Sequence, residues 1–143
     1  MNEALKINPI SIESLLLRDG SHFMMKHYDL AVKDYAEVIR LKPNNPDAYR
    51  SLGLVYLQKR DADLSLANFN EVIRLDPASN DAYENRGRAY MALGEFDLAI
   101  ADFENQLKLD PDNLFIQKRL LEIARRISKP NFTASSIFDV LVV

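Results

Sequence analysis

The chain has 143 residues, of which 48% are hydrophobic and 27% charged, and its formal net charge is −3 at pH 7. This composition is typical of a folded globular protein, and the length suits one compact domain or one short array. The acidic balance gives no sign of a general nucleic-acid binder, and no apolar run approaches the roughly 18 residues of a membrane span. The chain has no cysteine, which excludes disulfides, thiolate zinc sites and cysteine nucleophiles.

Four of the six prolines lie 34 residues apart, at Pro9, Pro43, Pro77 and Pro111. An apolar residue stands four positions before each of them, and another stands two positions before. This pattern is typical of the last turn of a helix, which a proline prevents from continuing. A period of this length indicates a repeat architecture, and it sets the register for the whole chain.

The chain begins inside a repeat, because Pro9 closes a helix that only eight residues precede. Residues 1–11 are therefore expected to be the end of a truncated repeat, cut from a longer array or truncated naturally. These residues lack the basic and apolar regions of a secretory signal. We expect a cytoplasmic protein, with the reservation that a fragment would have lost any signal.

Residues 12–45 form the first and most divergent repeat. Its first helix is expected to carry Leu15 and His22, and its second helix Ala31 and Tyr35. The pair Asp19-Gly20 replaces the close-packing glycine of the later repeats, so the first of these two helices has the weakest pattern.

Residues 46–79 show the plan of one repeat most clearly. Pro46 and Asp47 favour a helix start, and either Asp61 or Asp63 caps the second helix. The first helix has an apolar stripe of Tyr49, Leu52, Gly53 and Tyr56, and the second has one of Leu66, Phe69, Val72, Ile73 and Leu75. Two such amphipathic helices pack as an antiparallel hairpin, and a glycine without Cβ lets them approach closely.

Residues 80–113 repeat the plan, with Gly94 ending the first helix. The motif Tyr49-x-x-Leu52-Gly53-x-x-Tyr56, followed by Phe69 and Pro77, recurs as Tyr83-x-x-Arg86-Gly87-x-x-Tyr90, followed by Phe103 and Pro111. This pattern resembles the tetratricopeptide repeat (TPR) family over roughly residues 1–128, with Arg86 in place of the usual leucine. The resemblance implies an all-α solenoid of antiparallel helix pairs in a right-handed superhelix.

Residues 114–128 predict one further amphipathic helix without a partner, which would cap the last apolar face of the array. Its apolar positions include Ile116, Leu120 and Ile123. Residues 129–143 form a C-terminal tail that departs from the family pattern. Its last residues are apolar and β-branched, which is an aggregation risk if they are free. Docking on the array itself, or on a second copy, is therefore expected.

No catalytic constellation is present. His22 and His27 are the only histidines, and five residues apart they do not share a helical face. The carboxylates fall mainly at helix starts and on outer faces, as Asp61 and Glu104 do, and such groups are usually caps or solvated charges. We expect no enzyme, no cofactor and no metal site.

The first helix of each pair lines the concave side of a solenoid. The residues displaced from the packing stripe then face the groove. In chain order the four sets are Glu13, Leu16, Leu17, Gly20, Phe23 and Met24; Asp47, Arg50, Ser51, Leu54, Leu57 and Gln58; Asp81, Glu84, Asn85, Arg88, Met91 and Ala92; and Phe115, Lys118, Arg119, Glu122, Arg125 and Arg126.

The four sets change from apolar at the N-terminal end to cationic at the C-terminal end. An extended or helical segment of a partner protein, with acidic character, would complement this surface. Charges that merely keep a surface helix soluble are the competing interpretation of the basic end. The expected peptide-binding residues are Leu16, Phe23, Leu54 and Leu57 as apolar anchors, and Arg50, Asn85, Arg88, Lys118 and Arg119 as polar contacts.

The resemblance also implies a possible co-chaperone-like role. Some TPR domains bind a C-terminal carboxylate through basic residues and asparagines on three successive first helices. Arg50, Asn85 and Arg119 fall at such positions, but Leu54 replaces an asparagine and Phe115 replaces a lysine. The predicted function is a non-enzymatic adaptor or scaffold. The alternative is self-assembly, in which the truncated start and the tail mediate homo-oligomers.

Overall fold

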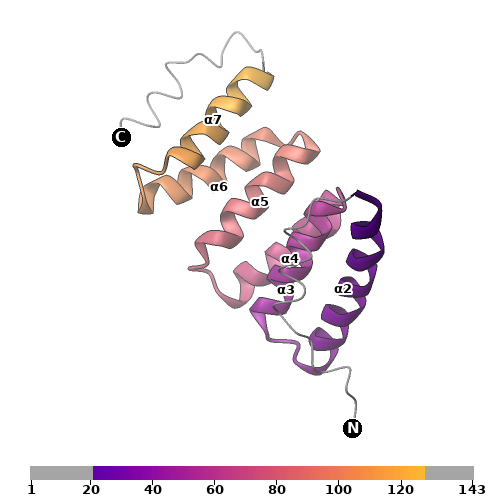
Figure 1. Ribbon diagram of the computed structural model, residues 1–143. Helices are drawn as coiled ribbons and strands as arrows, with labels where there is room; N and C mark the ends of the chain where they lie inside the picture. The colour runs from indigo at the N-terminus through magenta and orange to yellow at the C-terminus, as the bar shows by residue number, and fades with distance from the viewer. Residues whose placement is uncertain (1–20, 128–143) are drawn as a thin grey trace. The chain divides into compact units, whose positions relative to one another are not determined.

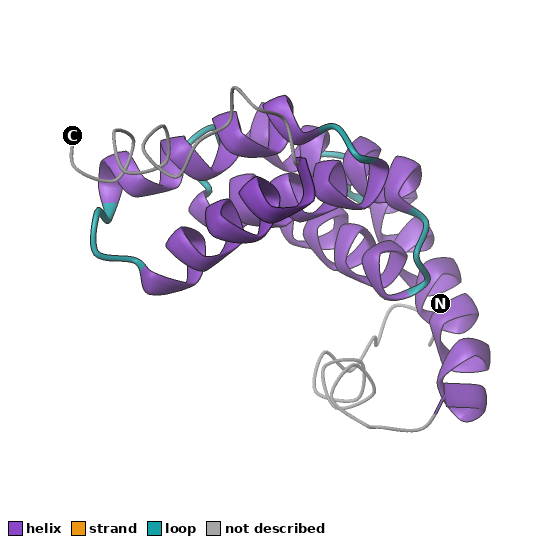
Figure 2. Ribbon diagram, turned by 90° about the horizontal axis from the view of Figure 1, so that it is seen from above, coloured by secondary structure: helices purple, strands orange, loops and turns teal. Residues whose placement is uncertain are grey.

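A computed structural model describes residues 21–127, with side chains from His27 onward. These residues form six helices and no strand, joined by short loops (Figure 1, Figure 2). The helices are α2 (Ser21–Leu41), α3 (Pro46–Gln58), α4 (Ala62–Leu75), α5 (Asn80–Leu93), α6 (Phe96–Leu109) and α7 (Leu114–Ile127). The prediction of an all-α chain is confirmed. None of the described helices is both long and apolar enough to cross a membrane.

The helices belong to two compact units. The first unit ends at Pro77 and contains α2 to α4, and the second begins at Ala78 and contains α5 to α7. In the first unit α3 packs against both α2 and α4.

Helix α3 begins with Pro46, and the side chain of Asn45 caps it by accepting a hydrogen bond from the Asp47 N–H. Helix α4 is capped by Asp61, which accepts from the Leu64 N–H at 3.2 Å. Of the two acids predicted for this cap, Asp61 is therefore the one used.

The close approach of α3 and α4 depends on Gly53, as the sequence predicts. A Cβ at this position would lie 2.8 Å from the ring of Phe69, nearer than side chains tolerate. The buried Ser65 hydroxyl adds a contact across the pair by donating a hydrogen bond to the Gly53 carbonyl at 2.9 Å. In the second unit Gly87 stands in the same relation to Phe103, at 2.7 Å. Both glycines thus offset their poor helix propensity by admitting an aromatic ring.

The N-terminal part of α2 differs from the sequence analysis. The sequence pattern predicts His22 and Phe23 in the first helix of their repeat, ahead of the helix that carries Ala31. The structure puts them in the same continuous helix as Ala31, beginning at Ser21. The reason is local, because no glycine or proline interrupts Ser21–Leu41, whereas Gly20 immediately precedes it.

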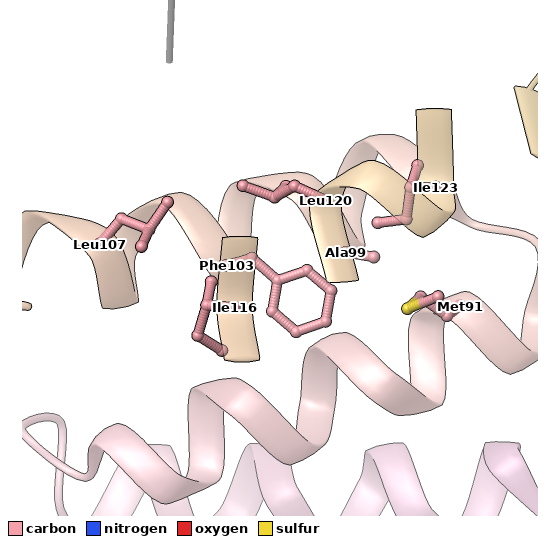
Figure 3. Packing of buried hydrophobic residues seen from close by; sticks show 7 residues of the cluster. All are labelled: Met91, Ala99, Phe103, Leu107, Ile116, Leu120 and Ile123. Carbon is pink, nitrogen blue, oxygen red and sulfur yellow. The ribbon is translucent and has the colours of Figure 1, made fainter. Parts of the chain in front are cut away.

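The core of the second unit joins all three of its helices. Met91 of α5 meets residues of α6 and α7, with the ring of Phe103 in the middle of the group (Figure 3). Helix α5 ends at Gly94, whose φ of 76° is the left-handed conformation that glycine adopts without strain. This helix end is where the sequence predicts it. The other members of the cluster are Ala99, Leu107, Ile116, Leu120 and Ile123.

A charged pair adds to the apolar packing between α5 and α6. Arg86 donates to Asp102 through Nε at 2.9 Å and through Nη2 at 2.7 Å, and the Asp102 side chain is only 4% exposed. The guanidinium also lies 5.3 Å from the ring centre of Tyr83 and 5.8 Å from that of Tyr90. This pair explains how the repeat accepts an arginine where the family pattern has leucine.

Candidate functional site

A pocket of about 300 Å³ lies between α5 and α7 in the second unit. Helix α5 contributes Arg88, Met91 and Ala92, which share a face because they are three and four residues apart. Helix α7 contributes a matching face of three residues. These are Arg119, Glu122 and Arg126.

The α7 side of the pocket is a small charge network. Glu122 accepts hydrogen bonds from Arg119 Nη1 at 3.1 Å and from Arg126 Nη2 at 2.6 Å. The Arg119 guanidinium also stacks over the Phe115 ring, 4.8 Å from its centre. Its Nε is buried and has no hydrogen-bond partner within residues 21–127. Arg119 is thus held in place while part of its hydrogen-bonding capacity is unused.

Arg88 is the cation on the α5 side. Its Nη1 donates to the Asn85 side-chain oxygen at 2.8 Å, while the Asn85 amide donates to the Asp81 carbonyl oxygen at 2.9 Å. Burial lowers the pKa of Arg88, and the positive charge of Arg119 lowers that pKa further. In the part of the chain that the structure describes, no carboxylate is hydrogen-bonded to Arg88. An entering anion would therefore stabilise this guanidinium.

Glu84 lies one turn before Arg88 on α5, and its environment opposes its charge. Burial raises the pKa of Glu84, and the negative charge of Asp81 adds to that effect, although Arg88 and Arg119 pull the pKa down. A carboxylate with a raised pKa in the folded state weakens folding once it ionises. Its unfavourable contribution therefore appears as the pH rises through the range of an ordinary glutamate and beyond it.

Glu84→Gln is accordingly expected to raise the free energy of unfolding at pH 7 by under about 1 kcal/mol, because the side chain is partly exposed to solvent. The gain should shrink as the pH falls toward about 4, because the wild-type carboxyl is protonated first in the folded state and then in the unfolded state. Urea unfolding of both proteins between about pH 3 and pH 8 measures this. A variant less stable than wild type at pH 7 would mean that attraction to the arginines outweighs burial.

Two of the predicted polar contacts, Arg88 and Arg119, line the pocket together. All six lining residues belong to the groove-facing sets. The predicted peptide-binding residues omit Arg126, although its position in the fourth set indicates that it faces the groove. Lys118 is exposed on α7 but does not line the pocket. Asn85 is buried and both ends of its amide are engaged within α5.

The remaining predicted residues belong to the first unit or lie outside the described part. In α3, Leu54 and Leu57 are half-buried, and Arg50 donates to Asp47 at 2.6 Å while its Nε is buried with no partner in the described chain. Leu16 is outside the described residues, and only the backbone of Phe23 is described. Their role in binding stays a prediction. Among the described residues no group of histidines and carboxylates is placed to hold a metal ion.

Several solved structures have a similar fold. The first TPR domain of Spaghetti (RPAP3), bound to the HSP90 peptide SRMEEVD, is 24% identical with a TM-score of 0.68, over 82% of this chain and 94% of that one. The Arabidopsis OM64 TPR domain is 23% identical with a TM-score of 0.64, over 80% of this chain and 94% of that one. MamA is 20% identical with a TM-score of 0.71, over 96% of this chain and 80% of that one.

Family models give the assignment in sequence. A model described as TPR repeat matches residues 23–59, and one described as tetratricopeptide repeat matches residues 55–113. No curated protein sequence matches the chain. The two models overlap and together span α3, α4, α5 and α6, whose glycines and aromatic residues make the contacts described above. The chain belongs to the tetratricopeptide repeat family.

Proposed function

We propose that this chain is a non-enzymatic protein–protein interaction module, an adaptor or scaffold, which binds an acidic segment of a partner protein. The α5/α7 pocket carries this proposal. Three arginines surround its opening, and Glu122 is the one acidic residue among the described residues that line it. Complementary charge steers such a partner to the surface and fixes its register.

The apolar part of the lining suits a protein ligand better than a free ion. Met91 and Ala92 provide hydrocarbon surface beside the guanidinium groups. An acidic side chain entering the pocket would contact the arginines with its charged end and this surface with its methylene groups. Specific sites commonly combine mainly apolar walls with a few well-placed polar groups.

The similar structure of the RPAP3 domain holds an acidic HSP90 peptide, which supports the same class of ligand here. A co-chaperone-like clamp for a terminal carboxylate is less well supported. Phe115 lies against Arg119 where such a clamp has a lysine, and Asn85 is already engaged within α5. We therefore favour an acidic segment that contacts Arg88, Arg119 and Arg126 over a clamped chain terminus.

Self-assembly through the chain ends is the alternative. The apolar C-terminal tail that this alternative invokes, residues 129–143, lies outside the described residues. Two exposed leucines on α7, Leu114 at 68% and Leu121 at 40%, are the observation that favours it. Charged substitutions at both positions would leave the sedimentation coefficient unchanged if the protein is an adaptor, and would lower it if α7 forms an interface between copies.

Selection from a random peptide library displayed on phage tests the proposal directly, with the full chain as bait. We expect the enriched peptides to contain aspartate or glutamate beside an apolar residue. The Arg88→Glu/Arg119→Glu variant should not enrich the same peptides. Enrichment of peptides without acidic residues would contradict the proposed function.

A further inference from the structure

We propose that the α5/α7 pocket receives a phosphorylated side chain, a phosphate dianion on serine or threonine of the partner protein, and binds it more tightly than a carboxylate. This inference rests on the proposed function and names the chemistry of its ligand. It concerns the pocket formed by Arg88, Arg119 and Arg126, together with Glu122 and the two apolar lining residues.

The charge of the lining residues matches a dianion. Three guanidinium groups face one carboxylate, Glu122, so two positive charges are left over. A phosphorylated side chain carries about −1.5 to −2 charges at pH 7, whereas a glutamate carries one. A carboxylate ligand would leave part of this positive charge without compensation. Glu84, one turn from Arg88, lies outside the lining, and its attraction to Arg88 and Arg119 offsets part of this positive excess.

The arrangement of hydrogen-bond donors leads to the same conclusion. Arg119 and Arg126 already share the carboxylate of Glu122, and each of them uses one nitrogen in doing so. Arg88 uses one nitrogen on the neutral amide of Asn85. Each guanidinium has five N–H donors, so most of the donors remain. Three phosphate oxygens can engage guanidinium groups on both helices, and a carboxylate offers only two oxygens.

Glu122 limits the affinity of any anion for this pocket. Because it holds Arg119 and Arg126 before any ligand arrives, a weak anion competes poorly for them. A dianion adjoining all three cations gains more than Glu122 loses by sharing its partners. We expect Glu122→Gln to tighten the binding of both peptides, and that of the phosphopeptide more, because the Glu122 carboxylate repels a dianion more strongly than a monoanion.

Met91 supplies a native probe of this pocket. The chain has four methionines, and Met91 is the one on the pocket wall. With methyl-labelled methionine, its NMR signal reports binding in the intact chain. Three peptides with the same uncharged flanking residues, and with serine, phosphoserine or glutamate at the centre, are titrated in turn, and inorganic phosphate is the fourth ligand.

The phosphoserine peptide should shift the Met91 signal saturably, and the glutamate peptide should need at least about fivefold higher concentration, a difference of about 1 kcal/mol. The serine peptide should cause no shift. Arg126→Gln should weaken phosphopeptide binding at least about tenfold. The matched control is Arg125→Gln, the adjacent exposed residue outside the pocket, and it should bind like wild type.

Equal affinity for the glutamate and phosphoserine peptides would overturn the phosphate inference while leaving the proposed function intact. Inorganic phosphate binding as tightly as the phosphopeptide would overturn it as well, because the pocket would then be an ion site only. A silent Met91 signal with every ligand would reject the inference too. The proposed function fails separately, if the library selection enriches no acidic peptides.

Discussion

Arg86→Leu is expected to lower the free energy of unfolding by about 3–5 kcal/mol, although it restores the leucine that the preceding repeat has at this position. The cause is Asp102, whose side chain is 4% exposed and pairs with Arg86 through two hydrogen bonds. Removing the arginine leaves the buried Asp102 carboxyl group between α5 and α6 without its partner. Chemical denaturation of the wild type and the variant at pH 7 measures the loss.

The preceding repeat suggests the matched control. Leu52 and Asn68 stand 34 residues before Arg86 and Asp102, so the double variant Arg86→Leu/Asp102→Asn copies a combination that this chain already uses. The Asn68 amide donates to the Leu64 carbonyl at 2.8 Å, which shows how an asparagine is satisfied there. Most of the stability should return in the double variant. A single variant as stable as wild type would show that the ion pair contributes nothing.

Reversing two charges in the pocket, Arg88→Glu with Arg119→Glu, is expected to weaken binding of a selected acidic peptide by at least about 100-fold. Each charge-assisted contact contributes about 1.5–3 kcal/mol, and the new glutamates repel the ligand. Salt should also cease to weaken binding, because it screens attraction to the arginines in the wild type but repulsion by the glutamates in the variant. Fluorescence anisotropy at several salt concentrations measures both effects.

The control for this variant has the same change in net charge. Lys108→Glu with Arg125→Glu alters two exposed cations of the second unit that do not line the pocket. Its affinity should fall by less than about threefold, through long-range electrostatics alone. Equal losses in the two double variants would indicate that the peptide responds to the overall charge and not to the pocket.

Much of the fold was predictable because the determining residues act locally and recur. Pro46, Asp61 and Gly94 each begin or end a helix by a mechanism that depends on neighbours a few positions away. Gly53 was predictable from a repeated motif, since its partner Phe69 lies at a fixed distance in sequence. The start of α2 was not, because the divergent first repeat provides no motif to separate its two helices.

The site was predictable in outline only. The 34-residue period fixes the register of α5 and α7, and helical geometry then identifies the faces that contain Arg88 and Arg119. Which polar groups are already engaged depends on side-chain conformation. Asn85 bonding within its own helix, Glu122 bridging two arginines and Asp102 pairing with Arg86 all fall in this class. None of these pairings follows from the repeat pattern.

Photo-crosslinking tests the central claim, that the partner's acidic segment binds at the α5/α7 pocket, most directly. A selected acidic peptide carries a diazirine next to its acidic residue, and mass spectrometry locates the crosslinks on the full chain. We expect them at residues 88–92 of α5 and 119–126 of α7, with loss of these crosslinks in the Arg88→Glu/Arg119→Glu variant. Crosslinks confined to α2–α4 or to α6, unaffected by that variant, would contradict the account.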